Sequence, residues 1–265
     1  MDYDRRSALA LIGGGLAAGL VGPSLIACAS ESEMKRAPRA PDSGDRVVHE
    51  PLPYVRLDPV HVGDLAYRNT YRGGCMYAVF GTIVDALAEQ VGEPFTSYPT
   101  TVTRYGGGGV AGWGTLCGTL NGAAMAIYLV SRDPGPAINE VFAFYEQEAL
   151  PNYVPAEARF RVPGSVAGST LCHVSISRWC DASGFDASSP ELGDRCAQLA
   201  ASVAKYTVEV LNAQLDGSFT TARQPTAAAL PCLGCHARGS AVESTFGKMD
   251  CGTCHTDKLE NHPNG

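Results

Sequence analysis

Apolar residues recur three and four positions apart in four separate stretches of the chain, and this spacing predicts a mainly α-helical body. The stretches are residues 75–91, 116–130, 137–150 and 189–215. The last opens with Ser189-Pro190, a pair typical of a helix cap followed by a first-turn proline. Four helices of this length suffice to form a bundle around one core.

Two further stretches carry weaker patterns. The glycine run at residues 106–114 lacks the order and the lysine of a phosphate-binding loop, so we expect it to allow a close approach of backbones. The following helix would carry Gly118 and Gly122 on one side, which leaves room for a neighbouring element. Residues 171–180 fit a strand or a helical turn equally well.

The beginning of the chain resembles an export signal. In residues 1–27, Arg5-Arg6 precede a long uncharged, glycine-rich stretch, as in twin-arginine signals. This stretch ends at Cys28 in a sequence that resembles the box that is cleaved and acylated in bacterial lipoproteins. An uncleaved membrane helix is the alternative. We expect lipidation of Cys28 and a location on the periplasmic side of a bacterial membrane.

Composition narrows the class of protein. The 265 residues carry a formal net charge of −7 and include ten cysteines. No basic run is long enough to follow a phosphate backbone, so we expect no nucleic-acid partner. Ten cysteines indicate cofactor ligation or an oxidising compartment.

Residues 28–53 are polar and rich in proline, which predicts a tether, and residues 54–222 would form the helical body.

Residues 223–265 contain two CxxCH motifs. In c-type cytochromes the two thiols bind a haem covalently and the histidine ligates its iron. A four-cysteine zinc site is the alternative, but it leaves both histidines unexplained. The segment also has few large apolar residues, so we expect two haem groups to supply its core. The residues predicted to bind them are Cys232, Cys235, His236, Cys251, Cys254 and His255.

Five cysteines remain after Cys28 and the two motifs are set aside. Their number is odd, so intrachain disulfides cannot use them all. Thiolates converging from several helices could hold an iron–sulfur cluster, whereas a mixture of disulfides and buried thiols would need no metal. The spacing leaves both interpretations open. These residues are Cys75, Cys117, Cys172, Cys180 and Cys196.

Several blocks of sequence resemble the split-Soret cytochrome c family, within the larger group named for its C-GCAxxG-C-C cysteine pattern. The resemblance extends from about residue 53 to the second CxxCH motif. The blocks are RGGCMY at residues 72–77, GVAGWGTLCG at 109–118, LCHVS at 171–175, Trp179-Cys180, Cys196, and GKMDC at 247–251.

The resemblance implies a homodimeric dihaem cytochrome with closely packed haems, two histidine ligands on each iron and an additional iron–sulfur centre. By this likeness the cluster ligands would be Cys117, Cys172, Cys180 and Cys196, or the same set with Cys75 replacing one of them. The resemblance also implies redox proteins as partners.

The remaining histidines are candidates for the second haem ligands. His173 is the first, since it follows Cys172, and His262 is a weaker one, with His49 and His61 as competitors. Iron with six ligands has no open position for a substrate, so we expect an electron carrier. The alternative is a haem or iron–sulfur oxidoreductase that acts on a small substrate at an open iron site.

Overall fold

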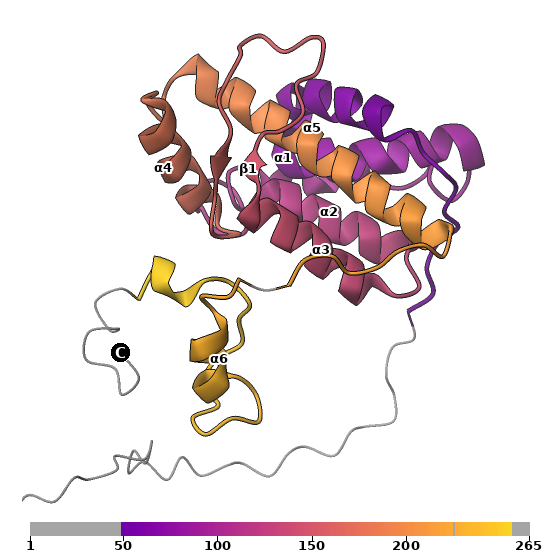
Figure 1. Cartoon of the computed structure of the whole chain (residues 1–265). Coiled ribbons are helices and arrows are strands. Elements are labelled where there is room, and N and C mark those ends of the chain that lie inside the picture. Colours follow the sequence, from indigo (N-terminus) through magenta and orange to yellow (C-terminus); the bar gives the residue numbers. More distant parts are fainter. Residues whose placement is uncertain (1–48, 225, 256–265) are drawn as a thin grey trace, which may run out of the picture.

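The computed structural model describes residues 49–224 and 226–255, and its regular structure is almost entirely helical (Figure 1). The predicted signal, Arg5-Arg6, Cys28 and His262 lie outside these ranges. The body contains α1 (Pro59–Val91), η1 (Thr100–Gly106), α2 (Gly118–Val130), α3 (Pro134–Gln147), β1 (Ala149–Leu150), β2 (Ser165–Val166), α4 (Cys172–Ser183) and α5 (Pro190–Leu215). The C-terminal segment contains α6 (Leu230–His236) and η2 (Cys251–Thr253).

Helix α1 begins sixteen residues before the predicted start at Cys75. Its first turn is capped by Asp58, whose carboxylate accepts hydrogen bonds from the backbone N–H groups of Val60 and His61. Helical conformation is interrupted at Gly74, with φ 81° and ψ 174°. Glycine adopts this positive φ without a steric penalty, so the helix can bend just before Cys75.

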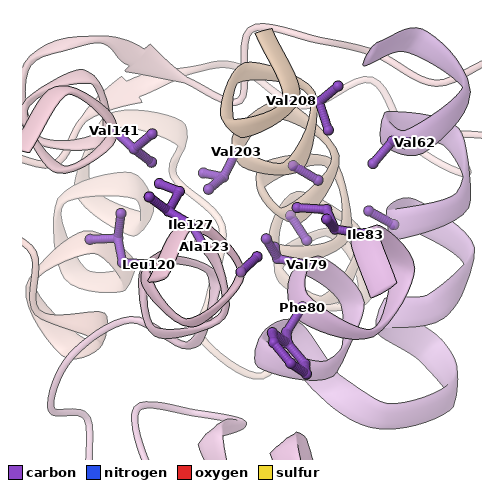
Figure 2. Packing of buried hydrophobic residues seen from close by; sticks show 14 of the residues in the cluster. Val62, Val79, Phe80, Ile83, Leu120, Ala123, Ile127, Val141, Val203 and Val208 are labelled. Atoms are coloured by element: carbon purple, nitrogen blue, oxygen red, sulfur yellow. The ribbon is translucent and has the colours of Figure 1, made fainter. Parts of the chain in front are cut away.

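The core lies among α1, α2, α3 and α5, with the most extensive contact between α1 and α5. Figure 2 shows Val79, Ile83, Ile127 and Val203 meeting there with their side chains fully buried. The predicted close approach along α2 is confirmed: a Cβ atom on Gly122 would lie 2.6 Å from the carbonyl oxygen of Met76 in α1. A larger residue at this position would push the two helices apart.

The third predicted helix ends earlier than expected. Helix α3 stops at Gln147, and Leu150 lies instead in β1, opposite Ser165 of the antiparallel strand β2. The prediction of helix up to Leu150 was therefore wrong. Pro151 disfavours helical backbone at the residue before it, although Leu150 is still buried as the apolar pattern indicated.

The undecided stretch around Cys172 is helical. Helix α4 runs from Cys172 to Ser183 and ends at Gly184, which has a left-handed φ of 76°. The next helix, α5, agrees with its prediction, since the Ser189 side chain caps it by accepting a hydrogen bond from the N–H of Leu192.

The described residues contain no helix long and apolar enough to cross a membrane.

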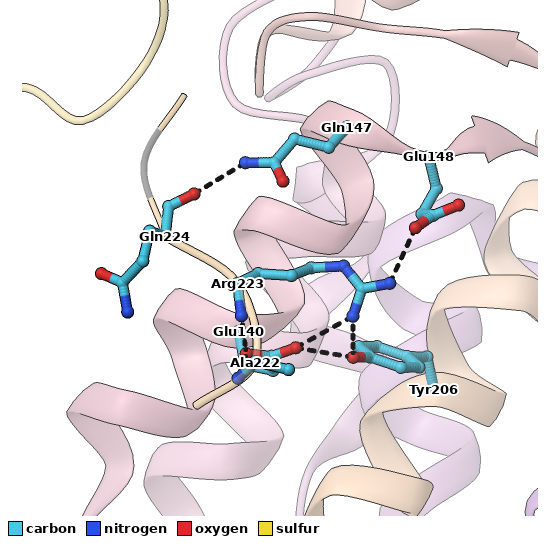
Figure 3. Close-up of polar contacts among 7 residues, drawn as sticks. All are labelled: Glu140, Gln147, Glu148, Tyr206, Ala222, Arg223 and Gln224. Carbon is cyan, nitrogen blue, oxygen red and sulfur yellow. Dashed lines mark hydrogen bonds and ion pairs between the residues drawn. The ribbon is translucent and has the colours of Figure 1, made fainter. Parts of the chain in front are cut away.

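The chain leaving α5 is held on the body by a buried carboxylate. Glu140 of α3, 2% exposed, accepts hydrogen bonds from the backbone N–H groups of Ala222 and Arg223 at 2.9 Å each, and from the Tyr206 hydroxyl at 2.8 Å (Figure 3). The Arg223 guanidinium bridges Glu140 and Glu148 at 3.0 and 2.7 Å. These contacts fix the point from which the C-terminal segment departs.

Candidate metal centre and haem-attachment segment

Four of the five cysteines that lie between Cys28 and the CxxCH motifs line one cavity of about 320 Å³ in the helical body. Each comes from a different element. Cys75 follows the bend in α1, Cys117 is the residue before α2, Cys172 begins α4, and Cys196 lies in the second turn of α5. The convergence predicted for these residues is therefore present in the fold, with Cys75 as a member of the set.

Backbone pairing brings Cys117 and Cys172 together. The N–H of Cys117 donates to the carbonyl of Thr170 at 2.9 Å, and the N–H of Cys172 donates to the carbonyl of Thr115 at 2.7 Å. This short antiparallel bridge places the starts of α2 and α4 next to each other. The sequence pattern did not reveal the bridge, because each strand is only one residue long.

Glycines provide the space that the cysteines need. A Cβ atom on Gly118 would lie 2.5 Å from the Cys75 sulfur, and a Cβ on Gly109 would lie 2.8 Å from Cys172 Cβ. Gly109 also has a positive φ of 67°. The glycine run thus allows the close approach of backbones that its sequence predicted.

The four thiols differ in acidity. The neighbouring Cys172 thiol lowers the pKa of Cys117 against the effect of burial, and the Thr119 hydroxyl, 3.3 Å from the sulfur, contributes in the same direction. The pKa of Cys172 is raised by the same pairing with Cys117 and by burial. The pKa of Cys75 is raised, mainly by burial and to a smaller extent by the charge of Cys117. Metal binding would release the protons of those thiols that are still protonated.

Two buried polar groups at this cavity have only thiols as neighbours. The Tyr145 hydroxyl and Arg195 Nε have no nitrogen or oxygen partner in the described part of the chain, and both residues line the cavity with the cysteines. Tyr145 interacts with the Cys117 thiol and the Arg195 side chain with the Cys196 thiol. Buried donors of this kind are normally satisfied. Together with the thiols they fit a negatively charged, sulfur-ligated group.

Cys180 does not line this cavity. It lies eight residues after Cys172 in the same helix and is partly exposed. Within residues 49–224 and 226–255, no three Cys, His, Asp or Glu side chains meet closely enough to hold a single metal ion. The four sulfurs instead surround a space, and a polynuclear cluster would span that space where one ion, with bonds near 2.3 Å, would not.

The two CxxCH motifs lie against each other. The first forms the end of α6 and the second begins at η2. Burial and the adjacent Cys232 thiol raise the pKa of Cys251, so thiols of the two motifs are neighbours. His236 Nδ1 lies 2.9 Å from the Ser244 hydroxyl oxygen.

No residue of α6 or η2 is buried, and Phe246 between them is 88% exposed. A segment with so little protein core fits one that packs around covalently bound haem.

Met249 attaches the second motif to the body. Its sulfur accepts hydrogen bonds from the Thr170 hydroxyl at 2.7 Å and from the Thr170 N–H at 3.4 Å. The N–H of Asp250 donates to Glu146 Oε1 at 3.1 Å. The Thr253 hydroxyl approaches Arg178 of α4 at 3.4 Å. The second CxxCH motif therefore lies beside the loop that leads into Cys172.

The candidate distal histidines occupy different positions. His173 is exposed at the start of α4, and its Nδ1 lies 2.8 Å from the Gly114 carbonyl oxygen. His49 Nε2 lies 3.0 Å from the Ser131 carbonyl oxygen, and its ring packs 4.2 Å from Tyr128. His61 is exposed in the first turn of α1. Of these, His173 is in the chain segment next to the cysteine cavity.

The fold and these sites define a mainly helical, cysteine-rich redox protein. Residues 75–210 match the family described as "Putative redox-active protein (C_GCAxxG_C_C)". The chain is 33% identical over 225 residues to split-Soret cytochrome c of Desulfovibrio desulfuricans. This match covers 78% of this chain and 81% of the relative. It therefore belongs to the C_GCAxxG_C_C family and, within it, to the split-Soret cytochromes c.

The fold agrees with this assignment. A solved structure of the split-Soret cytochrome c from Desulfovibrio desulfuricans, described as containing a novel iron centre, matches with a TM-score of 0.73 and 33% identity. The match covers 80% of this chain and 95% of that chain. The predicted mainly helical fold and the family resemblance are both confirmed.

Proposed function

We propose that the protein is an exported, lipid-anchored dihaem c-type cytochrome that carries electrons between redox partners and holds an additional iron–sulfur cluster. The observation that carries the proposal is the contact of Met249, next to the second CxxCH motif, with Thr170, whose carbonyl accepts a hydrogen bond from Cys117 of the cysteine cavity. Haem iron and an iron–sulfur cluster supply one-electron transfer without a bound substrate. Membership in a redox family supports the same conclusion.

The proposal assigns haem attachment and iron ligation to the following residues of this chain. The motif cysteines fix two haems covalently and close together, since Cys232 and Cys251 are neighbours. His236 and His255 provide the proximal ligands. His173 is proposed as a distal ligand because its Nε2 is the ring nitrogen turned away from the Gly114 contact, which Nδ1 makes.

We assign the second distal position to His262, with the haems of two chains meeting in a homodimer. An exposed His173 and an uncovered C-terminal segment are consistent with a partner chain that completes the haem site. Cys28 would carry the lipid after export, which would place the protein on the periplasmic side of the membrane. His262 and Cys28 lie outside the described residues.

We assign the cluster to Cys75, Cys117, Cys172 and Cys196, because these four line one cavity and Cys180 does not. The test is iron and haem quantification on the purified holoprotein, with EPR after reduction. C75S should lose the non-haem iron, while C180S should retain it. Loss of the cluster in C180S with retention in C75S would reverse the assignment.

A ligand-binding measurement separates the carrier from an enzyme. A carrier with two histidines on each iron should keep a low-spin ferric spectrum when cyanide or azide is added. Rapid spectral change with either anion would show an open iron position and favour an oxidoreductase that acts on a small molecule.

A further inference from the structure

Arg195 places a positive charge inside the cysteine cavity without a carboxylate to balance it. The residue is 1% exposed and follows the first turn of α5, directly before Cys196. One guanidinium nitrogen donates to the Ser175 hydroxyl at 2.8 Å, while Nε has no nitrogen or oxygen partner in the described part of the chain. No ion pair with Asp or Glu is formed by Arg195 among these residues.

The adjacent carboxylate does not neutralise it. Asp194 is also buried, but its oxygens are occupied by the hydroxyls of Tyr67 and Tyr71, the N–H of Phe160 and the Gln198 amide. Asp194 therefore closes a separate network, and no carboxylate pairs with the guanidinium among the described residues. The neighbouring side chain that does interact with it is the Cys196 thiol.

A buried charge of this kind is strongly unfavourable unless an opposite charge is brought to it. The cavity that Arg195 lines is also lined by four thiols and by Tyr145, whose buried hydroxyl has no nitrogen or oxygen partner in the described part of the chain and interacts with the Cys117 thiol. Two donors and four sulfurs thus line the same cavity. Thiolate sulfur, or a sulfur-ligated group held by it, would supply the opposite charge there.

We propose that Arg195 is the countercharge of the iron–sulfur group, and that with the Tyr145 hydroxyl it sets the reduction potential of that group. This inference rests on the proposed cluster. A cluster bound by four thiolates is negatively charged, and one-electron reduction adds one further negative charge without making or breaking a bond. The electron would come from a haem of the same protein. A nearby guanidinium stabilises the reduced form more than the oxidised form and so raises the potential, as do hydrogen bonds to cluster or cysteine sulfur.

The inference assigns Arg195 a positioning and electrostatic role distinct from ligation. A purely structural arginine, held only by Ser175, would affect folding and leave the potential of an intact cluster unchanged. A test should therefore change the charge of the Arg195 side chain and keep its size as constant as possible.

The experiment is an EPR-monitored redox titration of the reduced cluster in the holoprotein, comparing wild type with R195Q, R195K and Y145F. R195Q should lower the ratio of reduced to oxidised cluster at a fixed potential by about tenfold, equivalent to about 59 mV for a one-electron couple. R195K keeps the charge and should lie between R195Q and wild type. Y145F should give a smaller fall, about threefold. R56Q removes an exposed arginine that pairs with Asp216 and serves as the matched control, with an unchanged ratio.

The outcomes separate this inference from the proposed function. Absence of a cluster in wild-type protein would overturn both the cluster and the role of Arg195. A cluster in wild type with the same potential in R195Q would overturn the role of Arg195 alone. If R195Q is purified without non-haem iron, the reduction potential of the cluster in Y145F becomes the deciding measurement. An unchanged potential in Y145F overturns the inference.

Discussion

Thr170 and Met249 are in direct contact, with the Thr170 N–H directed at the Met249 sulfur at 3.4 Å. The carbonyl of the same threonine accepts the hydrogen bond from Cys117, and Cys172 follows two residues later. Met249 in turn lies two positions before Cys251, the first residue of the second CxxCH motif. The Thr170–Met249 contact thus connects the segment between Cys117 and Cys172 to the second CxxCH motif.

Met249→Ala should loosen the haem segment from the body. It removes the sulfur that both Thr170 donors use, and the loss of one such contact should speed amide exchange of residues 249–253 by about fivefold, or about 1 kcal/mol. Hydrogen exchange of the holoprotein measures this directly. Phe246→Ala is the control, because Phe246 is 88% exposed in the same segment. Equal exchange rates in the two variants would show that Met249 does not anchor the segment.

Gly118→Ala should damage the cysteine cavity. The added methyl group would lie 2.5 Å from the Cys75 sulfur and 2.6 Å from the Gly106 carbonyl oxygen, so we expect the free energy of unfolding to fall by about 1–3 kcal/mol and non-haem iron to be lost. Gly193→Ala, in α5, meets no atom within 4 Å and should gain up to about 1 kcal/mol. Denaturant unfolding and iron analysis measure both effects, and a normal iron content in Gly118→Ala would contradict the expected crowding.

Glu140→Gln should weaken the attachment of the chain that follows α5. We expect a loss of about 2 kcal/mol in the free energy of unfolding, since the carboxylate accepts four hydrogen bonds, two of them from Arg223. Glu209→Gln is the control, because its carboxylate forms only a partly exposed pair with Lys205. That pair should contribute about 0.5 kcal/mol or less.

The stability contributed by Glu140 should depend on pH in a defined direction. Burial alone would raise its pKa, but hydrogen bonds from the Arg223 N–H and from Tyr206 outweigh burial and hold the pKa below its ordinary value of 4.5. A lowered pKa means that the contribution is complete above the unfolded-state value and is lost as the pH falls through the folded-state value. The difference in unfolding free energy between wild type and Glu140→Gln, measured by denaturant unfolding, should therefore narrow as the pH falls below 4.5. A difference that stays constant down to pH 3 would contradict this assignment.

Much of the fold could be predicted because its signals are local. Helix α5 has a Ser189-Pro190 start and a continuous apolar stripe, and both appear in the structure. The first half of α1 was missed because Gly73-Gly74 interrupts the pattern, and because that half buries a polar residue, Asn69, which donates to Thr82 at 2.9 Å. Periodicity of apolar residues cannot detect a buried polar pair.

The candidate site was predictable only in part. The CxxCH motifs are complete within five residues each, whereas the cysteine cavity draws on residues more than a hundred positions apart. The proposal of Cys75 rather than Cys180 as a cluster ligand depends on the tertiary structure. The bend in α1 places Cys75 at the cavity, whereas Cys180 in α4 does not line it. Arg195 carried no sequence signal, since an arginine in an amphipathic helix is usually exposed.

The central claim is that both CxxCH motifs hold haem covalently, and the mass of the denatured chain tests it most directly. Protein produced together with a haem-maturation system should show the mass of two added haem groups per chain, and should keep its Soret absorbance after acid-acetone extraction. A variant with Cys251 and Cys254 replaced by Ser should show one added haem. A chain with no added haem, or one that loses all its colour on extraction, would contradict the account.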